Sequence, residues 1–168
     1  MELLDIYDKQ GEKLNYSISR EVAHKEGLWH KIACMFIINN RGEVLMQKRS
    51  HLKKNNPNGW GCSASGHIDA GENLITGALR ELDEEIGVKI SEKDLNYIGT
   101  VFENYNNNGM KIAHISEVFI IHKDIDLKDL TLQEEEVSDA KYYTIEDAEK
   151  TDFAKNHREI LELLKSNI

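Results

Sequence analysis

The sequence predicts an α/β fold of the α+β kind, in which a mixed β-sheet is covered by helices on both sides. Three stretches indicate this: a long apolar run at 28–39 followed by a hairpin, a helical pattern within 66–88, and an amphipathic helix at 156–166. The chain has 168 residues, enough for one domain with a core and too few for two. We therefore expect a single domain spanning 1–168.

The predicted strands are short apolar runs bounded by turn residues. In chain order they span 3–7, 28–39, 43–49, 60–65, 95–104, 111–122 and 140–143. The second and third are joined by the turn Asn39–Gly42, and the fifth and sixth by the asparagine-rich turn 105–109. Residues 19–27 are polar and end in glycine, and the sequence does not decide whether they form a helical turn or a loop.

Two helices are expected near the C-terminus. Thr144 is placed to cap a short helix at 145–150, with Asp147 at its third position as a weak capping box. The helix at 156–166 places its apolar side chains on one face, and these are Ile160, Leu161, Leu163 and Leu164. Between the strands and these helices, residues 123–136 form a long acidic loop, which at this length is more often functional than not.

The stretch 66–88 organises the rest of the chain. It begins in a glycine-bearing loop, continues as a helix and ends at Gly87. One face of this helix is an apolar stripe formed by Ile75, Ala78, Leu79, Leu82 and Ile86. Beside it, Glu81, Glu84 and Glu85 share a second face. Their mutual repulsion costs helix stability, and a divalent cation with a preference for oxygen ligands, Mg²⁺ or Mn²⁺, would remove that cost.

Residues 66–88 resemble the Nudix box at every specified position. Their sequence is G-H-I-D-A-G-E-N-L-I-T-G-A-L-R-E-L-D-E-E-I-G-V. The resemblance to the Nudix (MutT-like) hydrolase superfamily implies an α/β/α sandwich and metal-dependent hydrolysis of a nucleoside diphosphate linked to a group X. It implies four metal ligands, which are Glu81, Glu84, Glu85 and the carbonyl of Gly66. It also implies a structural role for Gly87 and an ion pair between Glu72 and Arg80.

A general base is also needed, and many Nudix enzymes place a catalytic or metal-binding glutamate before the last strand. Here Glu134, Glu135 and Glu136 occupy that region, and we expect one of them to act, with Glu135 and Glu136 as the catalytic candidates. A solvated charge run is the competing interpretation. Two interpretations of Gly77 also remain. A glycine in the middle of a helix costs about 1 kcal/mol of stability relative to alanine. Either another part of the chain approaches the helix backbone closely at this position, or the helix merely tolerates the glycine.

A finer resemblance links segments 20–30, 47–50 and 60–67 to the isopentenyl-diphosphate isomerase-like branch of the superfamily. In those isomerases, histidines and acidic residues hold a metal. The matching set for a second metal site is His24, His30, His67, Glu134 and Glu136. Imidazole together with carboxylate suits a transition metal. Ordinary loop and sheet histidines are the competing interpretation.

Isomerase activity is disfavoured because Ser65 stands where the isomerases have a cysteine before the Gly-His pair. A hydroxyl is a far poorer acid–base group than a thiol, and Cys62, three positions earlier in a strand, is expected to point to the opposite face. We therefore expect an isomerase-like Nudix hydrolase, with the isomerase and a non-catalytic ligand-sensing module as alternatives.

The amino-acid composition limits the kinds of molecule that the protein is expected to bind. A net charge of −9 disfavours nucleic acid polymers and anionic membranes, so we expect a small diphosphate substrate. Two cysteines in apolar surroundings, with no signal-like N-terminus, predict reduced thiols in a cytoplasmic protein. A homodimer is an open option. Substrate contacts are also open, and the candidates are Trp29, Phe102, Tyr105 and Phe119 for stacking and Lys48, Arg49, Lys53 and Lys54 for phosphate.

Overall fold

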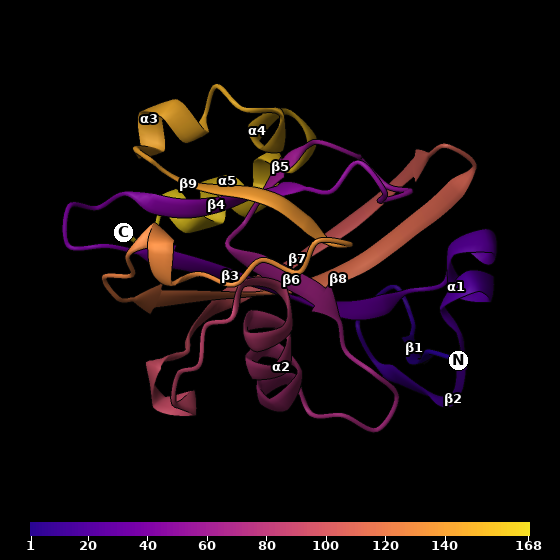
Figure 1. Ribbon diagram of the computed structural model, residues 1–168. Helices are drawn as coiled ribbons and strands as arrows, with labels where there is room; N and C mark the ends of the chain where they lie inside the picture. The colour runs from indigo at the N-terminus through magenta and orange to yellow at the C-terminus, as the bar shows by residue number, and fades with distance from the viewer.

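The computed structural model describes all 168 residues and contains nine strands and five α-helices (Figure 1). The strands are β1 (Leu3–Tyr7), β2 (Lys13–Ser19), β3 (His30–Ile38), β4 (Val44–Arg49), β5 (Trp60–Gly61), β6 (Ala64–His67), β7 (Asn96–Asn107), β8 (Met110–His122) and β9 (Val137–Tyr143). The helices are α1 (Arg20–Glu26), α2 (Leu74–Ile86), α3 (Ile145–Ala148), α4 (Asp152–Asn156) and α5 (Arg158–Lys165), with two short 3₁₀ turns at Glu92–Asp94 and Leu127–Asp129.

The main sheet is mixed, as the sequence predicts. Its strands run in the order β5-β4-β3-β8-β7, with β6 paired to β3 and β9 paired to β4. Strands β3 and β8 are parallel and the other pairs are antiparallel. Because β4 takes the C-terminal end of β3 and β6 takes its N-terminal half, the sheet opens between β4 and β6, and the candidate site lies there.

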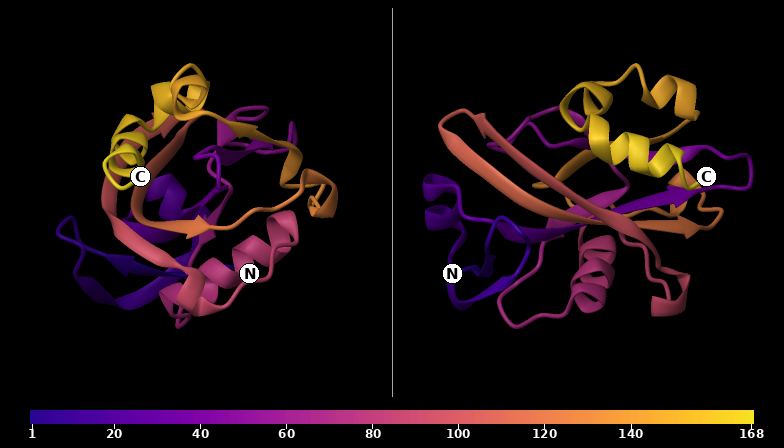
Figure 2. Two further views of the ribbon diagram at one scale, coloured as in Figure 1. Left: turned by 90° about the vertical axis from the view of Figure 1, so that its left-hand side faces the viewer. Right: turned by 180° about the vertical axis from the view of Figure 1, so that it is seen from behind.

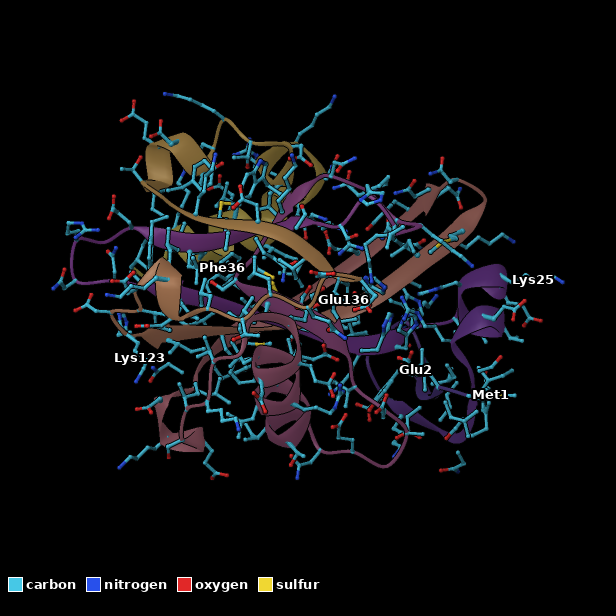
Figure 3. All side chains as sticks on the ribbon, in the orientation of Figure 1. Met1, Glu2, Lys25, Phe36, Lys123 and Glu136 are labelled. Carbon is cyan, nitrogen blue, oxygen red and sulfur yellow. The ribbon has the colours of Figure 1, made fainter.

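Helices cover both faces of this sheet (Figures 1 and 2). Helix α2 buries Ala78, Leu82 and Ile86 against one face, beside Met35 and Ile37 of β3. On the other face α4 and α5 pack over a second core, where the rings of Phe36 and Phe153 meet edge to face at 5.9 Å (Figure 3 labels Phe36). The side chains of β3 are buried on both faces, which explains its unbroken apolar sequence.

A smaller N-terminal layer lies at one end of the sheet and consists of β1, β2 and α1. It has its own small core of Leu4, Ile6 and Ala23. Segment 19–27, for which the sequence did not distinguish a helical turn from a loop, contains helix α1. Ser19 caps this helix by accepting a hydrogen bond from the Val22 amide, and Gly27 ends it at φ 72°.

Several elements differ from expectation. The strand expected at 60–65 is divided into β5 and β6, and helix α4 was not expected. Strand β2 was not predicted, although Leu14, Tyr16 and Ile18 alternate with polar residues along it. Leu14 and Tyr16 are exposed in the structure, so this strand buries little apolar surface.

The β7–β8 hairpin extends to Asn107, so the turn occupies Asn108 and Gly109, both at positive φ. Asparagine favours turns, and its presence in the last residues of β7 explains the early boundary that the sequence suggests. None of the helices has the length and apolar character needed to cross a bilayer.

Candidate active site

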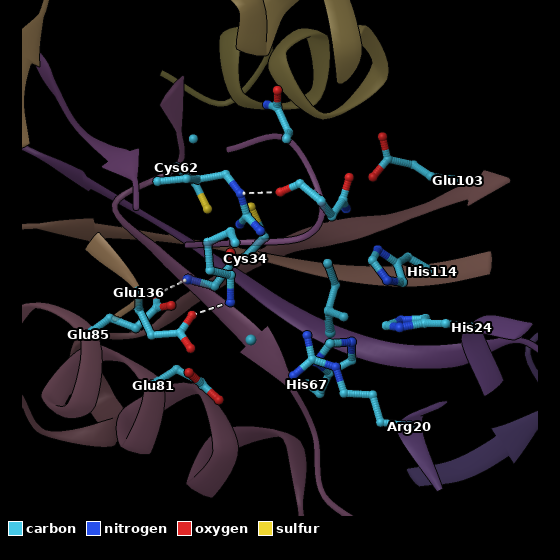
Figure 4. Close-up of a pocket in the computed structure, with 18 of the residues that line it drawn as sticks. Arg20, His24, Cys34, Cys62, His67, Glu81, Glu85, Glu103, His114 and Glu136 are labelled. Atoms are coloured by element: carbon cyan, nitrogen blue, oxygen red, sulfur yellow. Dashed lines mark hydrogen bonds and ion pairs between the residues drawn. The ribbon is translucent and has the colours of Figure 1, made fainter. Parts of the chain in front are cut away.

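The acidic face of α2 opens onto a cavity of about 1120 Å³ between α2, β6 and the acidic loop. Glu81, Glu84 and Glu85 all line it. The three differ in exposure, since the Glu84 side chain is 51% exposed, that of Glu81 is 12% exposed and Glu85 is 6% exposed as a residue. Figure 4 shows Glu81 and Glu85 at one end of this cavity, next to Glu136. The helix therefore presents one buried, one partly buried and one exposed acid to the same space.

Hydrogen bonds from residues of two strands hold the Glu85 carboxylate in place. Its Oε1 accepts a hydrogen bond of 2.8 Å from the Ser65 amide of β6 and one of 3.0 Å from Gln47 Nε2 of β4. Gln47 also donates to the carbonyl of Ser63, which fixes its orientation. Burial, followed by the charge of Glu81, raises the pKa of Glu85 to about 8. Gln47 belongs to segment 47–50 of the finer resemblance, but its contact with Glu85 could not be predicted, because it depends on the pairing of β4 with β5 and β9.

Glu81 lies directly against Gly66. A Cβ atom on Gly66 would fall 2.1 Å from the carboxyl carbon of Glu81, so no other residue fits without moving this acid. Burial raises the pKa of Glu81 to about 7, and the charges of Glu84 and Glu136 add to the effect. The raised pKa values show that the ionised forms of these two neighbouring carboxyls are only partly compensated, although Arg80 lies 2.7 Å from Glu81.

Arg80 joins the loop to the helix. Its Nε and Nη2 donate to the two oxygens of Glu72 at 2.8 and 3.0 Å, and Nη2 also donates to the carbonyl of His67 at 3.0 Å. Its Nη1 lies between two box acids, 2.7 Å from Glu81 and 3.2 Å from Glu84. Hydrogen bonding to Glu72 raises the pKa of Arg80, so the guanidinium stays charged. This is the ion pair that the resemblance implies, with further contacts to the acids.

Two glycines of the same motif have defined surroundings. A Cβ on Gly77 would fall 2.5 Å from Cδ1 of Ile68, so the close approach considered for this position exists. Gly87 ends α2 at φ 71° and lies against Thr131, whose Cβ would be 2.9 Å from an added Cβ. The Thr131 amide donates to the Ile86 carbonyl, which attaches the acidic loop to the end of the helix.

The acidic loop contributes one carboxylate to the cavity. Glu136 lines the cavity and forms an ion pair with Lys53. Glu134 and Glu135 are exposed and do not line it, so the structure does not bring these two predicted residues to the site. Gln133, which the sequence analysis missed, lines the cavity and donates from its amide to the Glu85 carbonyl at 3.0 Å.

At the other end of the cavity the histidines converge (Figure 4). One ring nitrogen from each of four histidines lies within 4.8 Å of the others, and we call this group the histidine cluster: His24, His30, His67 and His114. The Nε2 atom of each is buried and has no hydrogen-bond partner. Burial lowers the pKa of His24 and of His30 to about 4 and lowers those of His67 and His114 well below the ordinary value.

The histidine cluster differs from the set that the sequence suggests. No carboxylate belongs to it: Glu136 pairs with Lys53 at the other end of the cavity, and Glu134 lies on the surface. Its fourth member, His114, went unrecognised, because it lies opposite His30 only through the parallel pairing of β8 with β3. No local pattern in the sequence reports that pairing.

Two thiols also line the cavity. Cys34 and Cys62 are 3% and 4% exposed, and both line the cavity with Ser65. The expectation that Cys62 points away from Ser65 is wrong, because the chain leaves the strand conformation between β5 and β6. The Cys62 thiol donates to the Ala64 carbonyl at 3.2 Å. Its contact with Cys34, together with burial, raises the pKa of the Cys34 thiol well above its ordinary value.

The remaining wall carries the cations and aromatic groups available to a substrate. Arg49, Lys53 and Lys155 line it with Tyr105. Of the other candidates, Phe119 is buried in the core and the rings of Trp29 and Phe102 pack on each other at 5.5 Å, outside the cavity. His157, held by Glu103 at 2.7 Å, also faces the cavity and was not predicted.

Comparison with known proteins agrees with this geometry. The family model described as NUDIX domain matches residues 28–164. An uncharacterized Nudix hydrolase of Listeria monocytogenes is 34% identical over 149 residues, which cover 89% of this chain and 83% of that protein. Nudix hydrolase 3 of Arabidopsis thaliana is 34% identical over 152 residues, which are 87% of this chain but 20% of that protein.

Isomerases and solved structures are also similar. Isopentenyl-diphosphate Delta-isomerase 2 of Photorhabdus laumondii is 28% identical over 144 residues, covering 86% of this chain and 78% of that protein. The crystal structure of a MutT protein from Methanosarcina mazei aligns with a TM-score of 0.68 at 22% identity, over 83% of this chain and 95% of that one. This last likeness concerns the fold alone.

Proposed function

This chain belongs to the Nudix family, and we propose that it is a magnesium- or manganese-dependent hydrolase of a diphosphate linkage in a small substrate of the nucleoside diphosphate-X type. The observation that carries the proposal is the set of clustered acids on α2, of which Glu85 is buried and Glu81 partly buried, facing a cavity whose other wall supplies cations. A diphosphate can contact both, through the metal on one side and directly on the other.

The acid set fits a divalent ion of this kind. Hard oxygen donors suit Mg²⁺ and Mn²⁺, and the raised pKa values of Glu81 and Glu85 reflect charge that a cation would compensate. Glu81, Glu84, Glu85 and the Gly66 carbonyl would hold the ion, as the family resemblance implies. When bound, the ion polarises a phosphoryl oxygen and offsets the negative charge of the diphosphate.

The supporting residues fix these ligands. Ser65 and Gln47 hold the Glu85 carboxylate in one orientation by their two hydrogen bonds. Arg80, tied to Glu72, positions Glu81, and Gly66 leaves room for its carboxylate. A site whose ligands are oriented before substrate arrives loses little free energy to reorganisation during the reaction.

Glu136 is the proposed general base. It is the member of the acidic run that lines the cavity, and its charge reaches both Glu81 and Glu85. Lys53 forms an ion pair with it. A bound diphosphate would draw Lys53 to itself and leave Glu136 free to accept a proton from the attacking water. Tyr105, Arg49 and Lys155 are then available to the group X and the outer phosphate.

The second candidate function is isopentenyl-diphosphate isomerisation, which the identity to an isomerase favours. Ser65 replaces the cysteine expected for that chemistry, and its amide is engaged with Glu85. The two nearby thiols are buried, and Cys34 is held protonated. A ligand-sensing module without activity is disfavoured by the complete acid set. The free cysteines also support the proposed cytoplasmic location.

A substrate panel tests the proposal. The protein is incubated with Mg²⁺ or Mn²⁺ and a set of nucleoside diphosphate-X compounds and, separately, with isopentenyl diphosphate. We expect metal-dependent release of a nucleoside monophosphate or phosphate from one or more of the nucleotides and no double-bond shift. A shift of the double bond without phosphate release would establish the isomerase instead.

A further inference from the structure

We propose that His157, oriented by Glu103, contacts the group X of the substrate through its free Nε2 atom and selects an X that carries several hydroxyl groups, as a sugar does, over a hydrocarbon. The inference rests on the proposed hydrolase function, because it names the chemistry of X for that reaction. It concerns the wall of the cavity that faces the acids of α2. Figure 4 shows Glu103 on the opposite side of the cavity from Glu81 and Glu85.

The hydrogen bond between Glu103 and His157 is the first argument. Glu103 lies on β7 with its side chain 10% exposed, and His157 lies between α4 and α5. Nδ1 of His157 donates to Oε2 of Glu103 at 2.7 Å, since an ionised carboxylate can only accept. The second oxygen of Glu103 is 3.4 Å from the Ser116 hydroxyl. Because Nδ1 is engaged in this way, Nε2 is the nitrogen that remains for a ligand.

Aromatic contacts fix the imidazole ring. The ring centroid of Phe153 is 5.1 Å from that of His157, and the ring of Tyr105 lies 6.2 Å away. The His157 side chain is 21% exposed and lines the cavity, and its Nε2 makes no hydrogen bond within the protein. The ring is therefore held by three neighbours, with one polar atom available to a ligand. A group that is already oriented loses little entropy when the ligand binds.

The chemistry around this nitrogen matches hydroxyl groups. A hydroxyl can donate to a neutral imidazole and can accept from a protonated one, so it satisfies Nε2 in either state. Asn156 precedes His157, and Asn106 and Asn107 follow Tyr105 in β7, and all of these residues line the cavity. Amide groups also both donate and accept, and an aromatic ring offers an apolar surface to the C–H groups of a sugar. Together they suit a ligand with several hydroxyls.

A hydrocarbon or a phosphate would fit this wall less well. A hydrocarbon would remove water from Nε2 and supply no partner, and sites that bind a substrate hydroxyl reject analogues without it for this reason. This separates X from the isoprenoid chain of the alternative function. A phosphate could use Arg49 and Lys155 of the same wall. The carboxylate of Glu103 beside His157 instead favours a neutral ligand over an anion.

Three analogues that resist hydrolysis test this choice. In each, a methylene group replaces the bridging oxygen of an adenosine diphosphate–X compound, and X is ribose, a pentyl chain or a phosphate. Binding to the full-length protein is measured by calorimetry with Mg²⁺, so the result does not depend on turnover. We expect the ribose analogue to bind about 10-fold or more tightly than the pentyl analogue, and more tightly than the phosphate analogue.

Variants of the pair assign this preference to its residues. His157→Phe keeps a ring between Phe153 and Tyr105 but removes Nε2, so the ribose and pentyl analogues should bind with similar affinity. His122→Phe is the control, since His122 is exposed and lies outside the cavity, and it should keep the wild-type preference. Glu103→Gln should reduce the preference and allow the His157 proton onto either ring nitrogen. Nitrogen-15 spectra detect that change, which a merely structural role of Glu103 would not produce.

Several results would overturn the proposal. These are equal binding of the ribose and pentyl analogues to wild type, a preference that persists in His157→Phe, tightest binding of the phosphate analogue, and no binding of any analogue. If His157→Phe does not fold, an unchanged preference in Glu103→Gln decides against it. Hydrolysis of a nucleotide without any ribose preference would refute this subsite and leave the hydrolase. A ribose preference without hydrolysis would refute the hydrolase and leave the subsite.

Discussion

Gly66 and Glu81 are in contact: a Cβ atom added to Gly66 would lie 2.1 Å from the carboxyl carbon of Glu81 and 2.3 Å from both of its oxygens. The glycine of β6 and the acid of α2 are fifteen positions apart in sequence but form one unit in the site. The absent side chain at position 66 leaves room for the carboxylate that faces the cavity. The proposed metal site thus depends on a strand and a helix holding their relative position.

The first prediction concerns this contact. Gly66→Ala should displace the Glu81 carboxylate and lower metal-dependent hydrolysis by about 10²-fold, since a misplacement of about 1 Å has an effect of that size. The clashing atoms belong to the carboxylate at the end of the flexible Glu81 side chain, which can move aside, so the fold should persist. Kinetics at saturating metal and far-ultraviolet circular dichroism check both parts. Gly61→Ala is the control, because an added Cβ there meets only the Gln47 carbonyl at 4.0 Å.

The second prediction concerns the acids themselves. Glu85→Gln should lower kcat by about 10²- to 10³-fold, because it removes a charged ligand while keeping the hydrogen-bonding shape of the side chain. Glu84→Gln should have an effect in the same direction. The exposed Glu92→Gln, outside the cavity, should leave kcat at the wild-type value. Wild-type turnover in Glu85→Gln would remove this residue from the mechanism.

The third prediction concerns pH. In the folded metal-free protein the pKa values of Glu81 and Glu85 are about 7 and about 8, while in the unfolded chain both are near 4.5. Between pH 6.5 and 8 these two carboxyls bind more protons in the folded state, so their contribution to the free energy of unfolding falls as pH rises. The buried histidines act in the opposite sense near pH 6.5, because they are neutral in the folded state and half protonated in the unfolded chain, and their contribution cancels when wild type is compared with Glu85→Gln.

Denaturant unfolding with EDTA at pH 6.5 and pH 8 measures this slope. Relative to wild type, Glu85→Gln should gain free energy of unfolding as pH rises from 6.5 to 8, and it should be more stable than wild type at pH 8. Added Mg²⁺ should stabilise the wild type more at pH 8 than at pH 6.5, since protons compete with the ion for the same oxygens. A slope that is unchanged in Glu85→Gln would show that this carboxyl does not titrate in the range stated.

The fourth prediction separates the glutamates of the acidic loop. Glu136→Gln should lower kcat by about 10²-fold or more and remove the acidic limb of the pH–rate profile, as loss of a general base does. Glu135→Gln, the adjacent exposed residue, should leave both unchanged. Lys53→Ala should raise KM, because its amine is proposed to move to the phosphate. Equal loss in Glu135→Gln and Glu136→Gln would argue for a general charge effect.

The sequence predicts what is local. The apolar spacing of α2 and the run of buried residues in β3 define the two cores, and the glycine and acid positions in 66–88 define the box. It cannot report which strands become neighbours. His114 joins His30, and Gln47 reaches Glu85, only through strand pairing and the packing of α2 on the sheet. The choice of Glu136 among three adjacent glutamates depends on the direction of one side chain in a loop.

The most direct test is a crystal structure of the full-length protein soaked in Mn²⁺, with anomalous diffraction recorded at the manganese edge. We predict an anomalous peak that places a manganese ion within bonding distance of carboxylate oxygens of the α2 acids. Glu81 and Glu85 should be its ligands, with the Gly66 carbonyl beside them. Density without a manganese peak at these oxygens, at a concentration that supports turnover, would contradict the proposed metal site.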